Sequence, residues 1–427
     1  MKSFPGHIIF PIKSDTACLL KWSWSTINMQ EGHTSSCHRV HSNPIDPDNF
    51  DNFHNLVEKV QARNLMLQGE WPGHGCEYCA TIESSGGTSD RQLSLMQSHT
   101  IDKIPPELLK DPTAVEVTPT ILEVYFDNTC NMSCVYCDPQ VSSKLNDEIS
   151  RHGEIQIGSK KMVPFKKNHL RYQDLTNKLW QYLENSNRYQ TIRHYNMLGG
   201  EPFLQKELDQ GLEFWKHHPN PSLTFNLVSN LMIPHETFKQ KMVKFQQLVE
   251  SNAIYTVEIT ASMDCWGEQQ EYVRYGLDLE NVWIKNFEYL LDKEWVHVAI
   301  HSCISSLTIK TMPALLDKIN HWNTKTAQAI DHSFDLVIGD VWKEAAMHPI
   351  LFAPDVFEKD LETILSLMPQ STASQQASRS HMQGIATYLN TSQQDLEKIK
   401  NLQNYLTELD CRRGTNWKLL FPWLVNI

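Results

Sequence analysis

The segment Asp127-Asn-Thr-Cys-Asn-Met-Ser-Cys-Val-Tyr-Cys-Asp138 brings three cysteines together, with gaps of three and two residues. It directly follows a β-rich run, and closely spaced cysteines in a reducing compartment favour metal ligation over disulfide bonding. Cys130, Cys134 and Cys137 can supply three irons of a [4Fe–4S] cube and leave the fourth iron open to a substrate. A zinc knuckle that lacks one ligand and three unrelated core cysteines are the alternatives.

The residues on either side of this segment alternate between short β-rich runs and helical stretches. This alternation predicts βα units around a parallel sheet, in an α/β fold. The predicted strands are Thr120–Asp127, His194–Leu198, Leu223–Ser229, Thr256–Met263, Val296–Cys303 and Phe334–Gly339. The predicted helices between them are Leu175–Glu184, Leu204–Trp215, Glu236–Glu250, Val282–Leu291 and Thr311–Trp322. Six such units fit a partial (β/α)6 barrel better than a closed eight-fold one.

Three regions follow from this pattern. Residues 1–115 form a cysteine-containing auxiliary module, 116–345 the partial barrel, and 346–427 a helical C-terminal extension. A helix is expected at Asp51–Gln68 in the first region, and at Pro354–Leu367 and Gln394–Leu409 in the third. The polar stretch Gln370–Ser380 between the last two reads as a surface linker.

Composition narrows the classes of function. The chain has 427 residues, of which 41% are hydrophobic, and a net charge of −12, which disfavours a nucleic-acid partner. No run has the roughly 18 apolar residues of a membrane helix. The N-terminal residues Met1–Ile12 lack the apolar core of a signal peptide, so we expect a cytoplasmic protein without a membrane partner.

The C-x3-C-x2-C spacing, with Tyr136 just before the last cysteine, resembles the signature of the radical S-adenosylmethionine (SAM) superfamily. Asn196-Met-Leu-Gly-Gly-Glu-Pro-Phe203 is similar to that superfamily's GGEP motif, which ends its second strand. The resemblance implies that the triad holds a [4Fe–4S] cluster that binds SAM. It implies cleavage of SAM to a 5′-deoxyadenosyl radical that abstracts hydrogen from a substrate, with a reductant such as flavodoxin or ferredoxin as partner.

The same resemblance implies further cofactor-binding residues. The GGEP-like turn binds the SAM amino group in the family, and glycines there allow a ligand close to the backbone. Asn230 ends a strand where the family has a Thr-Asn-Gly-like turn, and Ser262 and Asp264 match a segment near the SAM ribose. Arg274 lies in a stretch from which it could bind a carboxylate through a charge-assisted fork. The implied cofactor-binding residues are Tyr136, Gly199, Gly200, Glu201, Pro202, Asn230, Ser262, Asp264 and Arg274.

A second cysteine set lies in the N-terminal region. Cys18, Cys37, Cys76 and Cys79 are a suitable inventory for a four-cysteine metal site, either structural zinc or iron–sulfur. Cys18 and Cys37 could also be simply buried. The order of Cys18-Leu-Leu-Lys-Trp22, Cys37 and the Cys76–Cys79 pair resembles SPASM/twitch-type radical SAM proteins and implies a second [4Fe–4S] cluster. In most of these proteins the auxiliary domain follows the barrel, whereas here the cysteines precede it.

Two further cysteines follow predicted strands. Cys265 and Cys303 would face the same mouth of the barrel, and either could donate a hydrogen atom to a substrate radical, as epimerases of the superfamily do. Packing is the alternative for both residues, because free cysteine is often buried.

These features support three functions. The first is a two-cluster radical SAM enzyme that modifies a peptide or protein side chain, and the second is the same chemistry on a small metabolite or nucleotide. The third is a zinc-stabilised binding protein without catalysis. The sequence specifies neither the substrate nor the outcome of the reaction.

Overall fold

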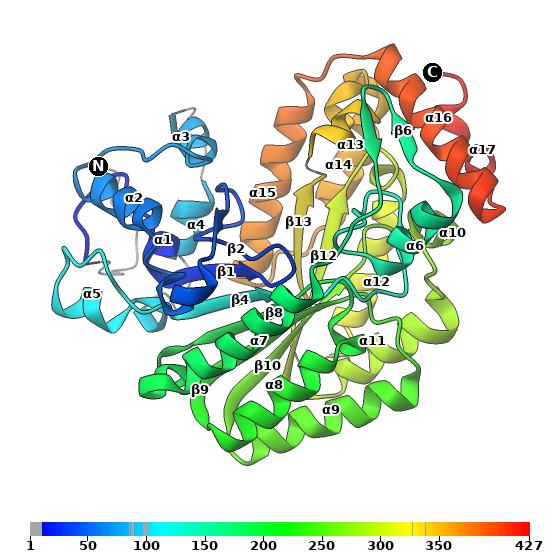
Figure 1. Cartoon of the computed structure of the whole chain (residues 1–427). Helices are drawn as coiled ribbons and strands as arrows, with labels where there is room; N and C mark the ends of the chain where they lie inside the picture. Colours follow the sequence, from blue (N-terminus) through cyan, green and yellow to red (C-terminus); the bar gives the residue numbers. More distant parts are fainter. Residues whose placement is uncertain (1–10, 85, 87–88, 97–100, 327, 338) are drawn as a thin grey trace.

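The computed structural model describes residues 11–427 except 85, 87–88, 97–100, 327 and 338. Most of the predicted N-terminal segment Met1–Ile12, and Ile338 of the last predicted strand, therefore lie outside the described residues. The fold is α/β. One large mixed β-sheet dominates the molecule, and helices cover its outer face (Figure 1).

The sheet has nine strands in the order β13-β12-β10-β9-β8-β4-β1-β2-β3. Its bounds are β1 Trp24–Asn28, β2 His33–Ser35, β3 Asn43–Pro44, β4 Ile121–Tyr125, β8 His194–Leu198, β9 Asn220–Ser229, β10 Ile254–Ser262, β12 Val296–Ile304 and β13 Asp331–Leu336. Every pair from β1 through β13 in this order is parallel, whereas β2 and β3 add antiparallel strands. All six predicted strands are thus present and adjacent in sequence order, and curvature into a barrel stays a prediction.

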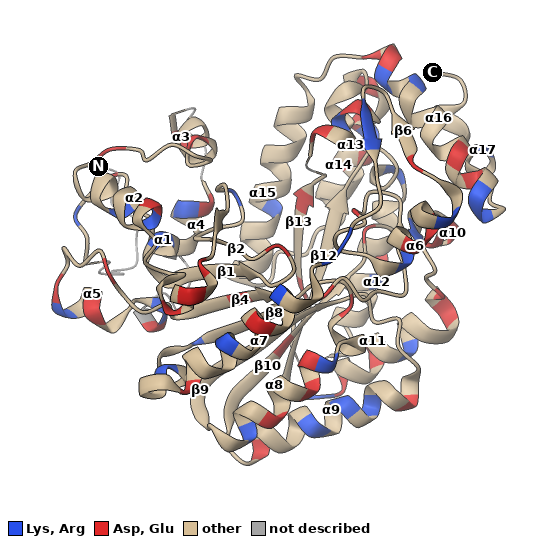
Figure 2. Ribbon diagram, in the orientation of Figure 1, with Lys and Arg blue, Asp and Glu red and all other residues tan. Residues whose placement is uncertain are grey.

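Helices between the strands bury one face of the sheet. They are α7 His169–Glu184, α8 Lys206–His217, α9 His235–Glu250, α11 Ile284–Leu291 and α12 Met312–Asn323. Phe225, Leu227, Val257 and Ile259 alternate along β9 and β10 and are fully buried on the helical side. The period of two is the pattern of a strand with one apolar face. Figure 2 shows both signs of charge interspersed on the outer surfaces of α8 and α9.

The N-terminal region joins the same sheet. Strand β1 pairs in parallel with β4, from Trp24 opposite Ile121 to Asn28 opposite Tyr125, so the sheet crosses the predicted boundary at residues 115 and 116. Its short helices are α1 Leu19–Ser23, α2 Val57–Leu67, α3 Glu77–Ser84, α4 Asp90–Met96 and α5 Pro106–Lys110. The helix predicted at Asp51–Gln68 corresponds to α2, which begins later, after a 3-10 turn over Pro47–Asn52.

The C-terminal region is helical and corrects one prediction. The short helix α13 (Asp340–Glu344) precedes this region, which contains α14 Glu358–Leu367, α15 Ala373–Leu389, α16 Leu396–Arg413 and α17 Trp417–Leu420. The predicted linker Gln370–Ser380 is wrong, because most of it forms the start of α15. A capping box between Thr372 and Gln375 starts this helix, and Met382, Ile385 and Leu389 bury its inner side. No helix in the described ranges is long and apolar enough to cross a membrane.

Candidate functional site

The cysteine triad lies in the loop that follows β4, at the carboxyl end of that strand. Within the loop, β5 (Ser133–Cys134) pairs with β11 (Arg274–Tyr275). All three cysteines are free thiols; Cys134 is buried, and Cys130 and Cys137 are partly exposed. Burial raises the pKa of Cys130 to about 12, with a further contribution from the charge of Cys134. Burial and the charges of Cys134 and Cys130 also raise the pKa of Cys137, so the three sulfurs lie within electrostatic reach of one another.

The GGEP-like turn at the end of β8 packs directly against this loop. Gly200 N donates to Asp127 O at 2.8 Å, and Glu201 N donates to Thr129 O at 2.7 Å. A Cβ on Gly200 would lie 2.3 Å from Thr129 O, which no ordinary contact allows, and Gly199 has a φ of +136°. Because the two glycines have no side chains, the backbone of the cysteine loop can pack directly against this turn. From the sequence, we predicted glycines here because they let a ligand approach the backbone closely, and that role stays a prediction.

Glu201 and Pro202 complete the turn inside the protein. Pro202 opens a 3-10 turn over Pro202–Leu204 and is buried. The Glu201 carboxylate is fully buried and accepts hydrogen bonds from Ser229 Oγ at 2.8 Å and Asn230 N at 2.7 Å. Burial raises its pKa to about 7 despite these bonds. Through these hydrogen bonds, Glu201 connects the end of β8 with the end of β9.

Asn230 connects the end of β9 with the triad. Its side-chain nitrogen lies 3.8 Å from Cys130 Sγ and 3.2 Å from Asn131 Oδ1. Its Oδ1 accepts from Met232 N at 2.7 Å, which fixes the orientation of the amide. An N–H group is therefore directed at a cysteine sulfur, the kind of contact that tunes iron–sulfur clusters.

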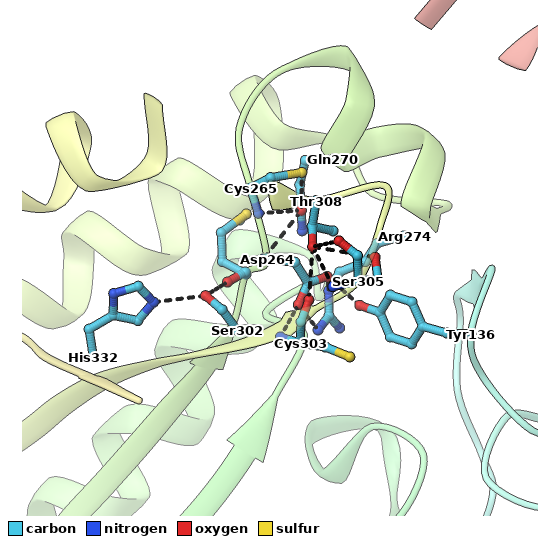
Figure 3. A network of polar contacts seen from close by, with 11 residues as sticks. Tyr136, Asp264, Cys265, Gln270, Arg274, Ser302, Cys303, Ser305, Thr308 and His332 are labelled. Atoms are coloured by element: carbon cyan, nitrogen blue, oxygen red, sulfur yellow. Dashed lines mark hydrogen bonds and ion pairs between the residues drawn. The ribbon is translucent and has the colours of Figure 1, made fainter. Parts of the chain in front are cut away.

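Asp264 is the centre of a buried polar network just beyond β10 (Figure 3). Arg274 donates two hydrogen bonds to its carboxylate, from Nε to Oδ2 at 2.7 Å and from Nη2 to Oδ1 at 2.9 Å. The Tyr136 hydroxyl donates to Oδ2, and Cys303 N donates to Oδ1 at 2.8 Å. The sequence predicted that the Arg274 guanidinium binds a carboxylate through two hydrogen bonds. It does so, but the carboxylate is that of Asp264 and not that of a ligand. The network joins the cysteine loop to the ends of β10 and β12, and cofactor contacts by these residues stay predictions.

The two isolated cysteines differ in their surroundings. Cys265 is fully buried, and its thiol lies 3.3 Å from Gln270 Oε1. Cys303 is partly exposed and lies opposite Asp335 in the β12–β13 register. Ser262 lies at the end of β10, opposite His301. Of the two thiols, Cys303 is therefore the one with exposed surface.

The four N-terminal cysteines line a single cavity. They come from the residue before α1, the loop after β2, and the start of α3, and Lys21 lines the cavity with them. Burial and the charge of Cys37 raise the pKa of Cys18 to about 12. Burial alone would also raise the pKa of Cys37, but the hydrogen bond and charge of His38 outweigh it and lower that pKa. Folding thus brings together cysteines that are far apart in the sequence.

Asp90 and Arg39 close one side of this cavity. Arg39 Nε binds Asp90 Oδ2 at 2.9 Å, and its Nη2 binds Asp335 Oδ1 at 3.1 Å. Hydrogen bonds that the protonated His38 ring donates to Asp90, and then to Cys37, raise the pKa of His38 to about 10. These contacts attach the N-terminal cysteine site to β13.

One row of polar residues was missed by sequence reasoning. Six neighbouring strands place a polar side chain at the same level on the face opposite the helices: Thr26, Glu123, Asn196, Asn226, Glu258 and His297. Thr26 Oγ1 donates to Glu123 at 2.8 Å, and Asn226 Nδ2 donates to Glu258 at 3.3 Å. Burial raises the pKa of both glutamates. Strands of a parallel sheet are usually apolar on both faces. Polar residues at every second position of these strands could therefore have indicated a polar face in the sequence.

Within the described ranges, no three His, Cys, Asp or Glu side chains are arranged around one point as the ligands of a single metal ion. The cysteines of a [4Fe–4S] cube each bind a different iron and therefore need not converge on one point.

Comparison with known proteins adds little to this geometry. No protein-family model matches the chain, and no curated protein matches it. Among solved structures, TYW1 with a lysine–pyruvate adduct bound is similar, with a TM-score of 0.30 and 12% sequence identity over 56% of this chain and 68% of that chain. A likeness of this size carries no argument about family or activity.

Proposed function

We propose that the chain is a radical SAM enzyme that binds a [4Fe–4S] cluster at Cys130, Cys134 and Cys137 and acts on a peptide substrate. One observation carries the proposal. Two motifs about sixty residues apart in the sequence, the triad and the GGEP-like turn, meet at the carboxyl end of two neighbouring parallel strands. Gly200 N and Glu201 N bond the loop that carries the cysteines. In parallel α/β folds, this end of the strands carries the chemistry.

The residues present fit the proposed cofactors. Three free thiols in one loop are the donor set of a cube with one open iron, and the Asn230 amide adds an N–H group beside Cys130. When bound, the cluster supplies the electron that cleaves SAM into methionine and a 5′-deoxyadenosyl radical.

The chain's own residues have supporting roles in this proposal. Tyr136, Asp264 and Arg274 hold the cysteine loop against the ends of β10 and β12 by a buried, charge-assisted network. Cys303, whose backbone joins that network, places a thiol at the inner face of the sheet, where it can donate a hydrogen atom to a substrate radical.

We further propose iron–sulfur rather than zinc at the N-terminal cysteines. Four thiolates around one cavity match a cube with no open iron, and a closed cluster suits electron transfer. Lys21, which lines the cavity and is almost fully buried, places an amine beside the sulfurs and offsets their negative charge.

Iron analysis and electron paramagnetic resonance test the proposal. Anaerobically reconstituted protein should hold about eight irons in two cubes, and the Cys130→Ala/Cys134→Ala/Cys137→Ala variant about four. Adding SAM should change the spectrum of the reduced wild type and leave that of the triple variant unchanged. Full iron content in the triple variant, or one zinc and no iron in the wild type, would overturn the proposal.

A further inference from the structure

The turn that follows β9 contains one residue in a backbone conformation that its side chain disfavours. Leu231 has a φ of +55° and is fully buried. Residues other than glycine, asparagine and aspartate rarely adopt this left-handed region, and a leucine there costs stability. Strained backbone of this kind is typical of functional sites, where the surrounding contacts enforce it. The turn lies directly beside the cysteine triad.

Hydrogen bonds hold the strained residue from both sides. Asn286, in α11, has no exposed surface and donates from Nδ2 to Leu231 O at 2.9 Å and to Ile233 O at 2.8 Å. Its Oδ1 accepts from His235 Nδ1 at 2.8 Å, which fixes the orientation of the amide. From the other side, Leu231 N donates to Ser229 Oγ at 2.9 Å. The turn is therefore locked in this conformation.

The locked turn directs the side chain of Asn230 at the cysteine loop. Asn230 Oδ1 accepts from Met232 N at 2.7 Å, so its Nδ2 faces the loop. Nδ2 lies 3.8 Å from Cys130 Sγ and donates to Asn131 Oδ1 at 3.2 Å. In return, Asn131 Nδ2 donates to Met232 O. The Asn230 amide cannot turn away from the sulfur without breaking these bonds.

We infer that Asn230 sets the reduction potential of the cluster at the triad, and that Asn286 is the positioning residue that holds Asn230 in place. An N–H group that donates to a ligating sulfur withdraws negative charge from it and thereby favours the reduced cluster, so the contact raises the potential. Asn286 acts through the turn, to which its Nδ2 bonds go. The inference rests on the proposed function for the cluster itself.

Asn230→Ser tests the contact with the sulfur. A serine hydroxyl can still accept from Met232 N, as in other turns of this type, but it carries no N–H toward Cys130. The potential of the triad's cluster should fall by about 30 to 60 mV. This shift is about a three- to tenfold change in a one-electron equilibrium, the value of one hydrogen bond.

The potential is measured by redox titration of the anaerobically reconstituted full chain. The titration follows the electron paramagnetic resonance signal that is absent from the Cys130→Ala/Cys134→Ala/Cys137→Ala variant. This choice separates the triad's cluster from a cluster at the N-terminal cysteines.

Asn286→Ala tests the positioning residue, and Asn220→Ala is its matched control. Asn220 lies at the start of β9, is buried, and likewise donates from Nδ2 to two carbonyls, Tyr189 O at 2.8 Å and Ile192 O at 2.7 Å. Both substitutions should lower the urea midpoint, because each removes two hydrogen bonds. Only Asn286→Ala should also lower the potential. Added to Asn230→Ser, it should cause no further fall.

An iron-loaded Asn230→Ser variant with the wild-type potential would overturn the inference. Equal shifts in Asn286→Ala and Asn220→Ala would also overturn it, because the effect would then be a general loss of stability. If Asn230→Ser retains no iron at the triad, this matched pair decides the question. A wild type without iron at the triad would contradict the proposed function, and the inference would fail with it. Unchanged potentials in iron-loaded variants would contradict this inference alone.

Discussion

At Gly200, a Cβ would lie 2.3 Å from Thr129 O and 2.6 Å from Thr129 C, both backbone atoms of the cysteine loop. Backbone cannot move aside as a flexible side chain can, so Gly200→Ala should displace the loop that carries Cys130. We expect the variant to lose about four irons, one cube's worth, and to unfold at a lower temperature. Wild-type iron content and an unchanged unfolding midpoint would contradict this reading of the turn.

Gly384 provides the matched control for this substitution. It lies inside α15, and apart from its chain neighbours and the backbone of the helix, no described atom lies within 4 Å of an added Cβ. Gly384→Ala should therefore raise stability by about 1 kcal/mol, since alanine is the better helix former, and leave the iron content unchanged.

The Asp264–Arg274 pair is buried, and its two charges depend on each other. Asp264 has no exposed surface, so removal of Arg274 would leave an uncompensated buried carboxylate. Arg274→Met should lower the free energy of unfolding by about 3–5 kcal/mol. The double variant Asp264→Asn/Arg274→Met should lose less, because no lone charge remains. Urea denaturation measures both, and an equal or larger loss in the double variant would exclude this account.

His332 predicts how stability depends on pH. Burial, and then the charge of His301, lower its pKa from 6.5 to about 3. Its Nε2 lies 2.8 Å from Ser302 Oγ, whose own hydroxyl donates to Met263 O, so Nε2 carries the proton. Between pH 6.5 and 3 the unfolded chain binds a proton at this histidine that the folded chain does not, so folding stability falls as the pH is lowered through that window.

The variant His332→Gln isolates this contribution. Glutamine can still donate to Ser302 and does not titrate. The loss of stability between pH 7 and pH 4, measured by urea denaturation, should be smaller in the variant than in the wild type. Parallel pH profiles would show that His332 does not contribute to the acid sensitivity.

At the scale of elements, α15 shows where sequence reasoning failed. The polar composition of Gln370–Ser380 suggested a linker, but Thr372 and Gln375 have the spacing of a capping box and bond each other's backbone amides at 3.1 and 3.3 Å. Local hydrogen bonding at a helix start can outweigh composition. The signal was in the sequence, in Thr-x-x-Gln followed by apolar residues at helical spacing.

Thr372→Ala tests the cap. Loss of an N-cap hydroxyl should lower the free energy of unfolding by about 1 kcal/mol. Thr387→Ala is the control, because Thr387 lies on the exposed side of the same helix and should change stability by less than about 0.5 kcal/mol. Similar effects of the two substitutions would remove the capping box as the reason the helix starts there.

The strands of the central sheet were predictable because each is a short apolar run with a period of two between helical stretches. His194–Leu198 was predicted with its observed bounds, and the others differ by a few residues at the ends. Strand β1 was not predicted. Its five residues lie among polar turns, and its pairing with β4 joins segments about a hundred residues apart, which no local pattern encodes.

At the scale of the whole molecule, sequence motifs identified the candidate cysteines but not their surroundings. The spacing of Cys130, Cys134 and Cys137 is local, so the sequence contained it. The pairing of Arg274 with Asp264, and the row from Thr26 to His297, depend on which strands become neighbours. Both follow from the order of the strands in the sheet, and local sequence patterns do not specify that order.

The N-terminal cysteines connect metal binding with folding. Cys18 and Cys37 reach the Cys76–Cys79 pair only in the folded module, so a bound metal or cluster should stabilise it. Cys76→Ala/Cys79→Ala should increase protease cleavage within residues 11–115, measured by limited proteolysis, and retain the triad's iron. Unchanged cleavage would show that this site contributes nothing to the stability of the module.

The central claim is that the cysteine triad performs reductive cleavage of SAM. Dithionite-reduced, reconstituted protein is incubated with SAM, and 5′-deoxyadenosine is quantified by chromatography. The account predicts slow formation of 5′-deoxyadenosine by the wild type and by Cys76→Ala/Cys79→Ala, and none above background by the triple variant of Cys130, Cys134 and Cys137. Equal amounts from the triple variant and the wild type, or none from the iron-replete wild type, would contradict it.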